Sequence, residues 1–265
     1  MTRARKFLKA VARIAVGLVV MMSGVTAWTH YGRGSEAPRI GLSLSGDWYD
    51  TSELNPAATG LALSRVGANV RNLEPDDLPN LDRILDGLDG LVLVGGMDDV
   101  DPALFGGDPS KARFVQRKRD DFEIELLRRA EQRKLPVLAL CRGAQLMAVA
   151  YGGALRPLDG EQASRHGISV SSLAAHRVSI DPWSRLERLV GSGPFTVSST
   201  HFQGIADAGR LRVAARSDDG LIEAVELPGD RFVLGLQWHP EWEPLAGDRS
   251  LAPFRALVQA AARNR

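Results

Sequence analysis

Short apolar runs alternate along the first half of the chain with longer segments whose apolar residues recur at helical spacing. The runs that predict buried strands are RIGLSLS (39–45), GLVLVGG (90–96) and PVLALC (136–141). The segments that predict helices are 56–70, 78–90, 118–134 and 142–153. The third is the clearest, because Phe122, Leu126 and Ala130 share one face at four-residue spacing. Strands that are apolar throughout and alternate with helices predict a parallel sheet covered by helices on both faces.

The second half of the chain predicts shorter strands and one final helix. The expected strands are HRVSID (176–181), FTVSST (195–200), LRVAAR (211–216), LIEAVEL (221–227) and FVLGLQW (232–238). The last two flank PGD, which predicts a hairpin with Gly229 in the turn. A helix over about 249–263 would close the domain. The predicted fold class is therefore α/β: a single doubly wound domain with a mostly parallel central sheet and a small antiparallel hairpin region.

Residues 1–38 differ from the rest and predict a signal peptide or a membrane anchor. Five basic residues before position 14 precede fifteen residues without charge, IAVGLVVMMSGVTAW. This arrangement is typical of a secretory signal, and Val25, Thr26 and Ala27 offer small residues for cleavage. A retained anchor is the alternative, since flanking apolar residues lengthen the run toward a spanning helix. In both cases the basic end stays inside and the domain is expected outside the cytoplasm, exported or anchored to the inner membrane, with a cytoplasmic location as the alternative.

Composition supports one globular domain over residues 39–265. The chain has 265 residues, of which 44% are hydrophobic and 25% charged, and it shows no internal repeat. The part after residue 38 holds 27 basic and 31 acidic residues, a net charge of −4. Nucleic acid is therefore not expected as a partner, because phosphate binding needs a basic face. The sequence leaves a homo-oligomer open, and membrane contact is expected only through an uncleaved N-terminal segment.

The single cysteine, Cys141, ends a predicted buried strand and begins a predicted helix. This position lies at the carboxyl edge of the sheet, where open α/β folds bind ligands. Ala139 and Gly143 are small enough for the close approach of a nucleophile elbow, and a helix N-terminus lowers the pKa of a thiol. A buried structural cysteine is the alternative interpretation. One cysteine excludes an intramolecular disulfide and a metal site of several cysteines.

A histidine and a glutamate follow a later strand in the segment LGLQWHPE. His239 stands just past this strand, and Glu241 two positions on would share its face in an extended backbone. Together with Cys141 they would form a nucleophile, a base and a group that orients the base. The alternative is a surface turn of His, Pro and Glu.

Seven ordered motifs resemble a known family. They are VGGMDDVDPALFGG, KRDDFEIELLRRA, PVLALCRGAQLMAVAYGGAL, HRVSI, SSTHFQGI, SDDGLIEAVE and LGLQWHPE, and they span about residues 39–260. The chain resembles the γ-glutamyl-γ-aminobutyrate hydrolases, a peptidase C26-like group within the class I glutamine amidotransferase-like superfamily. The resemblance implies a flavodoxin-like fold and cleavage of the γ-glutamyl amide bond of a small γ-glutamyl-amine through a thioester, without a cofactor.

The resemblance also implies roles for individual residues. Cys141, His239 and Glu241 match the family triad. The backbone N–H groups of Gly96 and Arg142 would hold the oxyanion, and glycine at the end of GLVLVGG suits a close approach of backbone to substrate. The residues that match the family's substrate-binding segments are Gln145, Ser199, His201 and Gln203.

Other features limit these expectations. The acids Asp98, Asp99 and Asp101 resemble a metal cluster but predict turn and helix-cap oxygens, so no metal is assigned. Ser198 stands where the family motif begins with asparagine, which bears on the identity of the substrate. Two alternatives to the hydrolase are a glutaminase subunit that supplies ammonia to a synthetase and a relative that binds γ-glutamyl compounds without turnover.

Overall fold

The structure is a computed structural model that describes residues 36–45, 54–167, 174–242 and 248–265. The predicted signal peptide or anchor therefore lies outside the described residues, apart from its last three positions. Within the described ranges, no helix is both long enough and apolar enough to cross a membrane.

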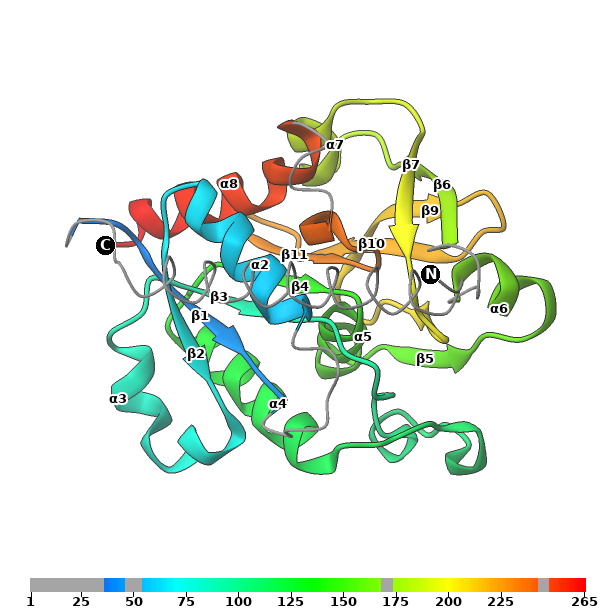
Figure 1. Cartoon of the computed structure of the whole chain (residues 1–265), viewed down its shortest axis with the longest axis horizontal. Helices are drawn as coiled ribbons and strands as arrows, with labels where there is room; N and C mark the ends of the chain where they lie inside the picture. Colours follow the sequence, from blue (N-terminus) through cyan, green and yellow to red (C-terminus); the bar gives the residue numbers. More distant parts are fainter. Residues whose placement is uncertain (1–35, 46–53, 168–173, 243–247) are drawn as a thin grey trace, which may run out of the picture.

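One half of the central sheet is parallel and contains the strands expected from the apolar runs (Figure 1). Its strands, in spatial order, are β2 (Asn69–Leu73), β1 (Arg39–Ser43), β3 (Gly90–Leu93), β4 (Val137–Leu140) and β11 (Val233–Leu236). All four neighbouring pairs run parallel. The carboxyl ends of these strands therefore meet at one edge of the sheet, where ligands bind in such folds.

The other half of the sheet is antiparallel and is larger than the expected hairpin. It contains β10 (Ile222–Glu226), β9 (Arg212–Ser217), β6 (Ala174–Ile180), β7 (Phe195–Ser199), β8 (Gln203–Asp207) and β5 (Ala154–Pro157). The predicted hairpin is present, with β10 antiparallel to β11 and Gly229 at a φ of +99° in the turn. Short connections between half-polar strands favour antiparallel neighbours, which extends this part of the sheet beyond two strands.

Helices cover both faces of the sheet and create two apolar cores (Figure 1). The helices are α2 (Leu54–Arg65), α3 (Leu81–Leu85), α4 (Arg117–Gln132), α5 (Arg142–Ala150), α6 (Gly160–His166), α7 (Arg185–Val190) and α8 (Asp248–Arg263). Leu91 and Leu93 of β3 belong to the core with α3, α4 and α5, whereas Val92 belongs to the core with α2, α7 and α8. A strand packed on both faces must be apolar at every position, which is the pattern of the sequence.

Segment 56–70 departs from its prediction as one helix. Helix α2 ends at Arg65, Gly67 takes a φ of +98°, and the chain continues as strand β2. Positive φ favours glycine and ends a right-handed helix. β2 lies at the edge of the sheet and is only partly buried, so its sequence lacks the apolar run of the inner strands.

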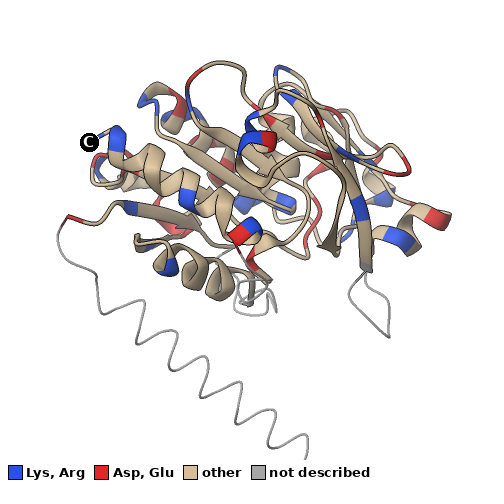
Figure 2. Cartoon of the chain, turned by 90° about the horizontal axis from the view of Figure 1, so that it is seen from above, with Lys and Arg blue, Asp and Glu red and all other residues tan. Residues whose placement is uncertain are grey.

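Charged residues of both signs are spread over the fold. Figure 2 shows Lys and Arg interspersed with Asp and Glu along the ribbon in this view. Single exposed pairs such as Arg128 with Glu125 on α4 contribute little stability.

Candidate active site

Cys141 occupies a strained turn between β4 and α5. Its backbone has a φ of 47° and a ψ of −110°, a conformation that residues other than glycine rarely adopt, and its N–H donates to the carbonyl of Leu236 at 2.7 Å. Gly143 allows this turn, because a Cβ there would lie 2.6 Å from the carbonyl oxygen of Leu93. Backbone strain of this kind costs on the order of 1–3 kcal/mol and persists where the surrounding structure enforces it. The turn holds the thiol, which is 2% exposed, at the carboxyl edge of the sheet.

His239 and Glu241 come together with Cys141 at this edge. His239 Nδ1 lies 2.7 Å from Glu241 Oε1, and both side chains are buried. An ideal Cβ built on Gly95 would lie 3.1 Å from His239 Cε1 and 3.4 Å from Cys141 Cβ, so the imidazole and the thiol flank the same backbone position. Burial by itself would lower the pKa of His239, but the charges of Cys141 and Glu241 outweigh it and raise that pKa to about 10. The two charges therefore favour the protonated imidazole of His239.

The contact between His239 and Glu241 arises from a 3₁₀ helix rather than from the expected extended backbone. Residues Pro240–Trp242 form one turn of 3₁₀ helix directly after His239. This turn lays the ring of Trp242 parallel to the imidazole, with 3.7 Å between ring centroids and 2° between planes. Trp242 Nε1 donates to Asn55 Oδ1 at 2.9 Å, which connects the turn to α2.

Three residues around His239 were not identified from the sequence: Trp242, Asn55 and Thr200. Thr200 Oγ1 lies 3.1 Å from His239 Nε2, whereas Glu241 contacts the other ring nitrogen, Nδ1. Thr200 is part of the motif SSTHFQGI, from which only Ser199, His201 and Gln203 were expected to contact substrate. Asn55 stands in a segment far from every motif, and only the packing of α2 brings it to the site.

The loop after β3 lies beside Cys141 and contains the predicted oxyanion residue Gly96. A Cβ at Gly96 would overlap the guanidinium of Arg119 and the carboxylate of Asp98, so glycine is required by the close packing. Arg119 donates to the carbonyl oxygens of Val94 and Gly95, both at 3.1 Å. Arg142 is the first residue of α5, and a backbone N–H at that position has no acceptor within its own helix.

Buried charges support this loop and the start of α5. Arg142 contacts Asp98 at 2.9 Å and Glu123 at 2.6 Å, and it also pairs with Asp120. Arg119 contacts Asp98 at 2.7 Å and Glu123 at 3.2 Å. All five side chains are essentially inaccessible to solvent. The segment KRDDFEIELLRRA thus contributes charged residues to the interior as well as an apolar face, which its helical spacing did not predict.

The candidate substrate residues divide into two groups. Gln145, His201 and Gln203 line a hollow next to Cys141, together with Gly96. Gln145 Nε2 donates to the carbonyl of Gln203 at 2.7 Å, which connects α5 to the start of β8. Ser199 is fully buried and its hydroxyl donates to the carbonyl of His166 at 3.0 Å, so it points away from this hollow.

The acidic residues near Gly96 form hydrogen bonds and ion pairs with other groups of the protein. Asp101 caps the following turn by accepting from the N–H of Ala103 at 2.8 Å, and Asp99 accepts from the N–H of Arg113 at 2.8 Å. Asp98 instead pairs with the two buried arginines, Arg119 and Arg142. Asp101 thus provides the cap oxygen that the sequence predicted, whereas Asp99 joins two loop segments and Asp98 is a member of a buried ion-pair cluster.

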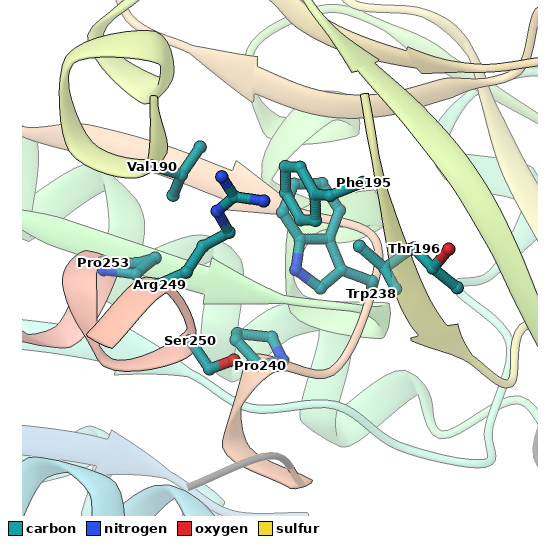
Figure 3. Close-up of a pocket in the computed structure, with 9 residues that line it drawn as sticks. Val190, Phe195, Thr196, Trp238, Pro240, Arg249, Ser250 and Pro253 are labelled. Carbon is teal, nitrogen blue, oxygen red and sulfur yellow. The ribbon is translucent and has the colours of Figure 1, made fainter. Parts of the chain in front are cut away.

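A second hollow is lined by Trp238 and Pro240, the two chain neighbours of His239 (Figure 3). Phe195, Trp238, Pro240 and Arg249 are among its lining residues. Phe195 meets Trp238 edge to face with 6.0 Å between centroids, and Arg249 stacks over Phe195 at 4.7 Å. These contacts hold Trp238 and so support the backbone from which His239 projects.

The fold resembles that of class I glutamine amidotransferase domains. The glutaminase domain of Trypanosoma brucei CTPS, solved with bound acivicin, superposes with a TM-score of 0.62 at 18% identity, over 86% of this chain and 94% of that one. At this identity the match shows the fold alone.

Sequence comparisons identify the family. A family model for peptidase C26 matches residues 62–241. A Mycobacterium tuberculosis protein with the provisional description glutamine amidotransferase is 38% identical over 243 residues, 86% of this chain and 76% of that protein. The γ-glutamyl-γ-aminobutyrate hydrolase PuuD of Escherichia coli strain K12 is 36% identical over 192 residues, 68% of this chain and 74% of that protein. The chain belongs to the peptidase C26 family, and these relatives support a hydrolase.

Proposed function

We propose that the protein hydrolyses the γ-glutamyl amide bond of a small γ-glutamyl-amine, with Cys141 as nucleophile. The observation that carries the proposal is the convergence of the thiol, His239 and Glu241 at the carboxyl edge of the sheet. The 36% identity to a γ-glutamyl-γ-aminobutyrate hydrolase supports the class of substrate.

The proposed first step forms a thioester. The sulfur of Cys141 attacks the γ-carbonyl carbon, and the carbonyl electrons move onto the oxygen, which the N–H groups of Gly96 and Arg142 stabilise. The oxyanion then collapses, the C–N bond breaks, and the imidazolium of His239 protonates the departing amine. Glu241 keeps the imidazole oriented through its 2.7 Å contact with Nδ1.

The second step releases glutamate. His239 takes a proton from a water molecule, which attacks the thioester carbonyl, and the C–S bond breaks to regenerate the thiolate beside the imidazolium. Thr200 lies against Nε2, the nitrogen that exchanges these protons, and so restricts the position of the ring. The described site residues carry out both steps without a cofactor.

The test is a substrate panel with matched variants. The full chain is incubated with γ-glutamyl-γ-aminobutyrate, other γ-glutamyl amides and the corresponding α-glutamyl amides, and glutamate release is measured. We expect turnover of γ-glutamyl amides only, and a loss of about 10³-fold or more in kcat/KM for Cys141→Ala. Release that survives this substitution, or equal cleavage of α- and γ-linked amides, would refute the proposal.

Glutamine belongs in the same panel, because one relative is described as a glutamine amidotransferase. Turnover of glutamine that far exceeds every γ-glutamyl-amine would favour an ammonia-supplying glutaminase. Binding of γ-glutamyl amides without any release of glutamate would favour a non-catalytic relative. The proposed location outside the cytoplasm, which rests on residues 1–38, would separate the domain from cytoplasmic synthetases.

A further inference from the structure

A cluster of buried histidines and one glutamate lies apart from the triad. His166 ends α6, His176 is in β6, His201 follows β7, and Glu223 is in β10. All four side chains are at least nine-tenths buried, and Glu223 is completely inaccessible. Ligand atoms of His166, His176 and Glu223 all lie within 4.8 Å of one another.

The atoms that converge in this cluster lack hydrogen-bond partners. Both oxygens of Glu223, Nδ1 of His166, both ring nitrogens of His176 and Nε2 of His201 are buried without one. A buried carboxylate without hydrogen bonds is costly, and buried charges are normally paired or bound to a metal. The cluster therefore calls for a positive charge beside Glu223, which a bound cation or a protonated histidine can supply.

The outer contacts of two histidines direct electron pairs toward Glu223. His201 Nδ1 lies 2.9 Å from the carbonyl oxygen of Gln203. A carbonyl only accepts, so Nδ1 holds the proton and a neutral His201 turns the lone pair of Nε2 inward. His166 Nε2 lies 3.0 Å from the Asp219 carboxylate, which leaves Nδ1 facing the cluster. A carboxylate behind a histidine is the usual second contact of a metal-binding imidazole.

Ligand atoms of three residues lie close enough for one ion. Glu223 Oε1 lies 3.3 Å from His166 Nδ1 and 3.2 Å from His176 Nε2. Zinc bonds of about 2.0–2.2 Å in tetrahedral geometry separate neighbouring ligand atoms by about 3.3 Å. His201 Nε2 lies 3.8 Å from Glu223 Oε1 but does not belong to the group whose ligand atoms all lie within 4.8 Å of one another. Two imidazoles and one carboxylate are a donor set that zinc accepts.

We propose that His166, His176 and Glu223 bind one structural Zn²⁺. The ion would join α6, β6 and β10 at one point, and no ligand is shared with Cys141, His239 or Glu241. The carbonyl of His166 accepts from the N–H of His201 in the loop after β7, and Thr200 of the same loop contacts His239. Zinc would thus stabilise the wall of the candidate active site without entering the reaction.

The test measures metal binding directly, in a background that removes the competing thiol. The full chain with Cys141→Ala and without a histidine tag is stripped with a chelator and titrated with Zn²⁺ against a chromophoric chelator. We expect one equivalent of tight binding, and with Co²⁺ an intense visible absorption typical of four-coordinate sites. Binding of no Zn²⁺, or of Zn²⁺ with no saturable stoichiometry, would overturn the proposal and leave proton sharing among the histidines as the explanation.

Substitutions in and beside the cluster test whether these residues bind the Zn²⁺. Glu223→Gln keeps the shape of the side chain, removes its charge, and should weaken Zn²⁺ binding more than about 10-fold. Asp219→Asn alters the outer contact of His166, together with the hydrogen bond that Asp219 accepts from Ser217, and should weaken Zn²⁺ binding by about 10- to 100-fold. Glu226→Gln is the matched control, a buried carboxylate on the same strand whose oxygens bind the N–H groups at the start of α7 instead; it should keep the site.

Far-ultraviolet circular dichroism checks that each variant is folded. If Glu223→Gln does not fold, Asp219→Asn and His176→Asn decide the question. Zn²⁺ affinity that is unchanged in the folded cluster variants would place the metal elsewhere and refute the assignment.

Discussion

Replacement of Arg142 by methionine is the most informative perturbation of this fold. Arg142 is 1% exposed and contacts Asp98 and Glu123 at 2.9 and 2.6 Å, besides its pair with Asp120. Methionine fills a similar apolar volume but leaves these three buried carboxylates facing a single cation, Arg119. Removing one partner of a buried ion pair costs about 3–5 kcal/mol. Because three pairs are lost at once, we expect a loss at the upper end of this range in the free energy of unfolding at pH 7.

The loss should depend on pH in a defined direction. Burial alone would raise the pKa of Asp98, but Arg142 and Arg119 outweigh it and hold that pKa below its ordinary value. Burial raises the pKa of Asp120 even though Arg142 opposes it. Without Arg142 both pKa values rise, so the folded variant binds more protons than the unfolded chain. Its stability then increases as the pH falls, and the deficit relative to the wild type should be smaller at pH 5 than at pH 7.

The assay is urea unfolding at both pH values, followed by circular dichroism. Arg128→Met is the matched control, because Arg128 lies on the surface of α4 with a side chain that is 53% exposed and pairs with the neighbouring carboxylate of Glu125. Its loss should stay below about 1 kcal/mol. An Arg142→Met protein that is no less stable than Arg128→Met, or whose deficit grows on acidification, would refute the reasoning.

Two further substitutions test the site. Gly143→Ala places a Cβ 2.6 Å from the carbonyl oxygen of Leu93 and should lower the free energy of unfolding in urea by about 1–3 kcal/mol. Gly87→Ala is the control, because its Cβ would lie 3.4 Å from the nearest atom, and it should change this free energy by less than about 0.5 kcal/mol. Equal effects of the two substitutions would show that the approach of α5 to β3 is not tight. Glu241→Gln keeps a contact with His239 Nδ1 but removes a charge that raises the pKa of His239. The imidazolium should then titrate at lower pH, and alkylation of Cys141 by iodoacetamide should be slower at neutral pH, because a smaller share of the protein holds a thiolate beside a protonated imidazole. An alkylation profile identical to that of the wild type would exclude Glu241 from tuning this pair.

The sequence by itself determined the helices and strands whose apolar pattern follows from their burial. Strands buried on both faces must be apolar throughout, so β1, β3, β4 and β11 were visible as runs, and α4 was visible as an amphipathic pattern. The elbow at Cys141 was visible because a strand, a small residue and a helix must meet in one tight turn. The roles of the triad residues in catalysis stay predictions for the substrate panel.

Only the tertiary structure decided which distant residues meet. The edge strand β2 lacks an apolar run because solvent covers part of it, so its pattern merged with that of α2. Asn55 reaches the site only because the turn after β11 packs against α2. The same holds for the buried charges around Arg142 and for the cluster around Glu223, whose members come from four separate elements. Periodicity reports which face of an element is buried, whereas the partner that a buried polar group finds depends on how the layers are assembled.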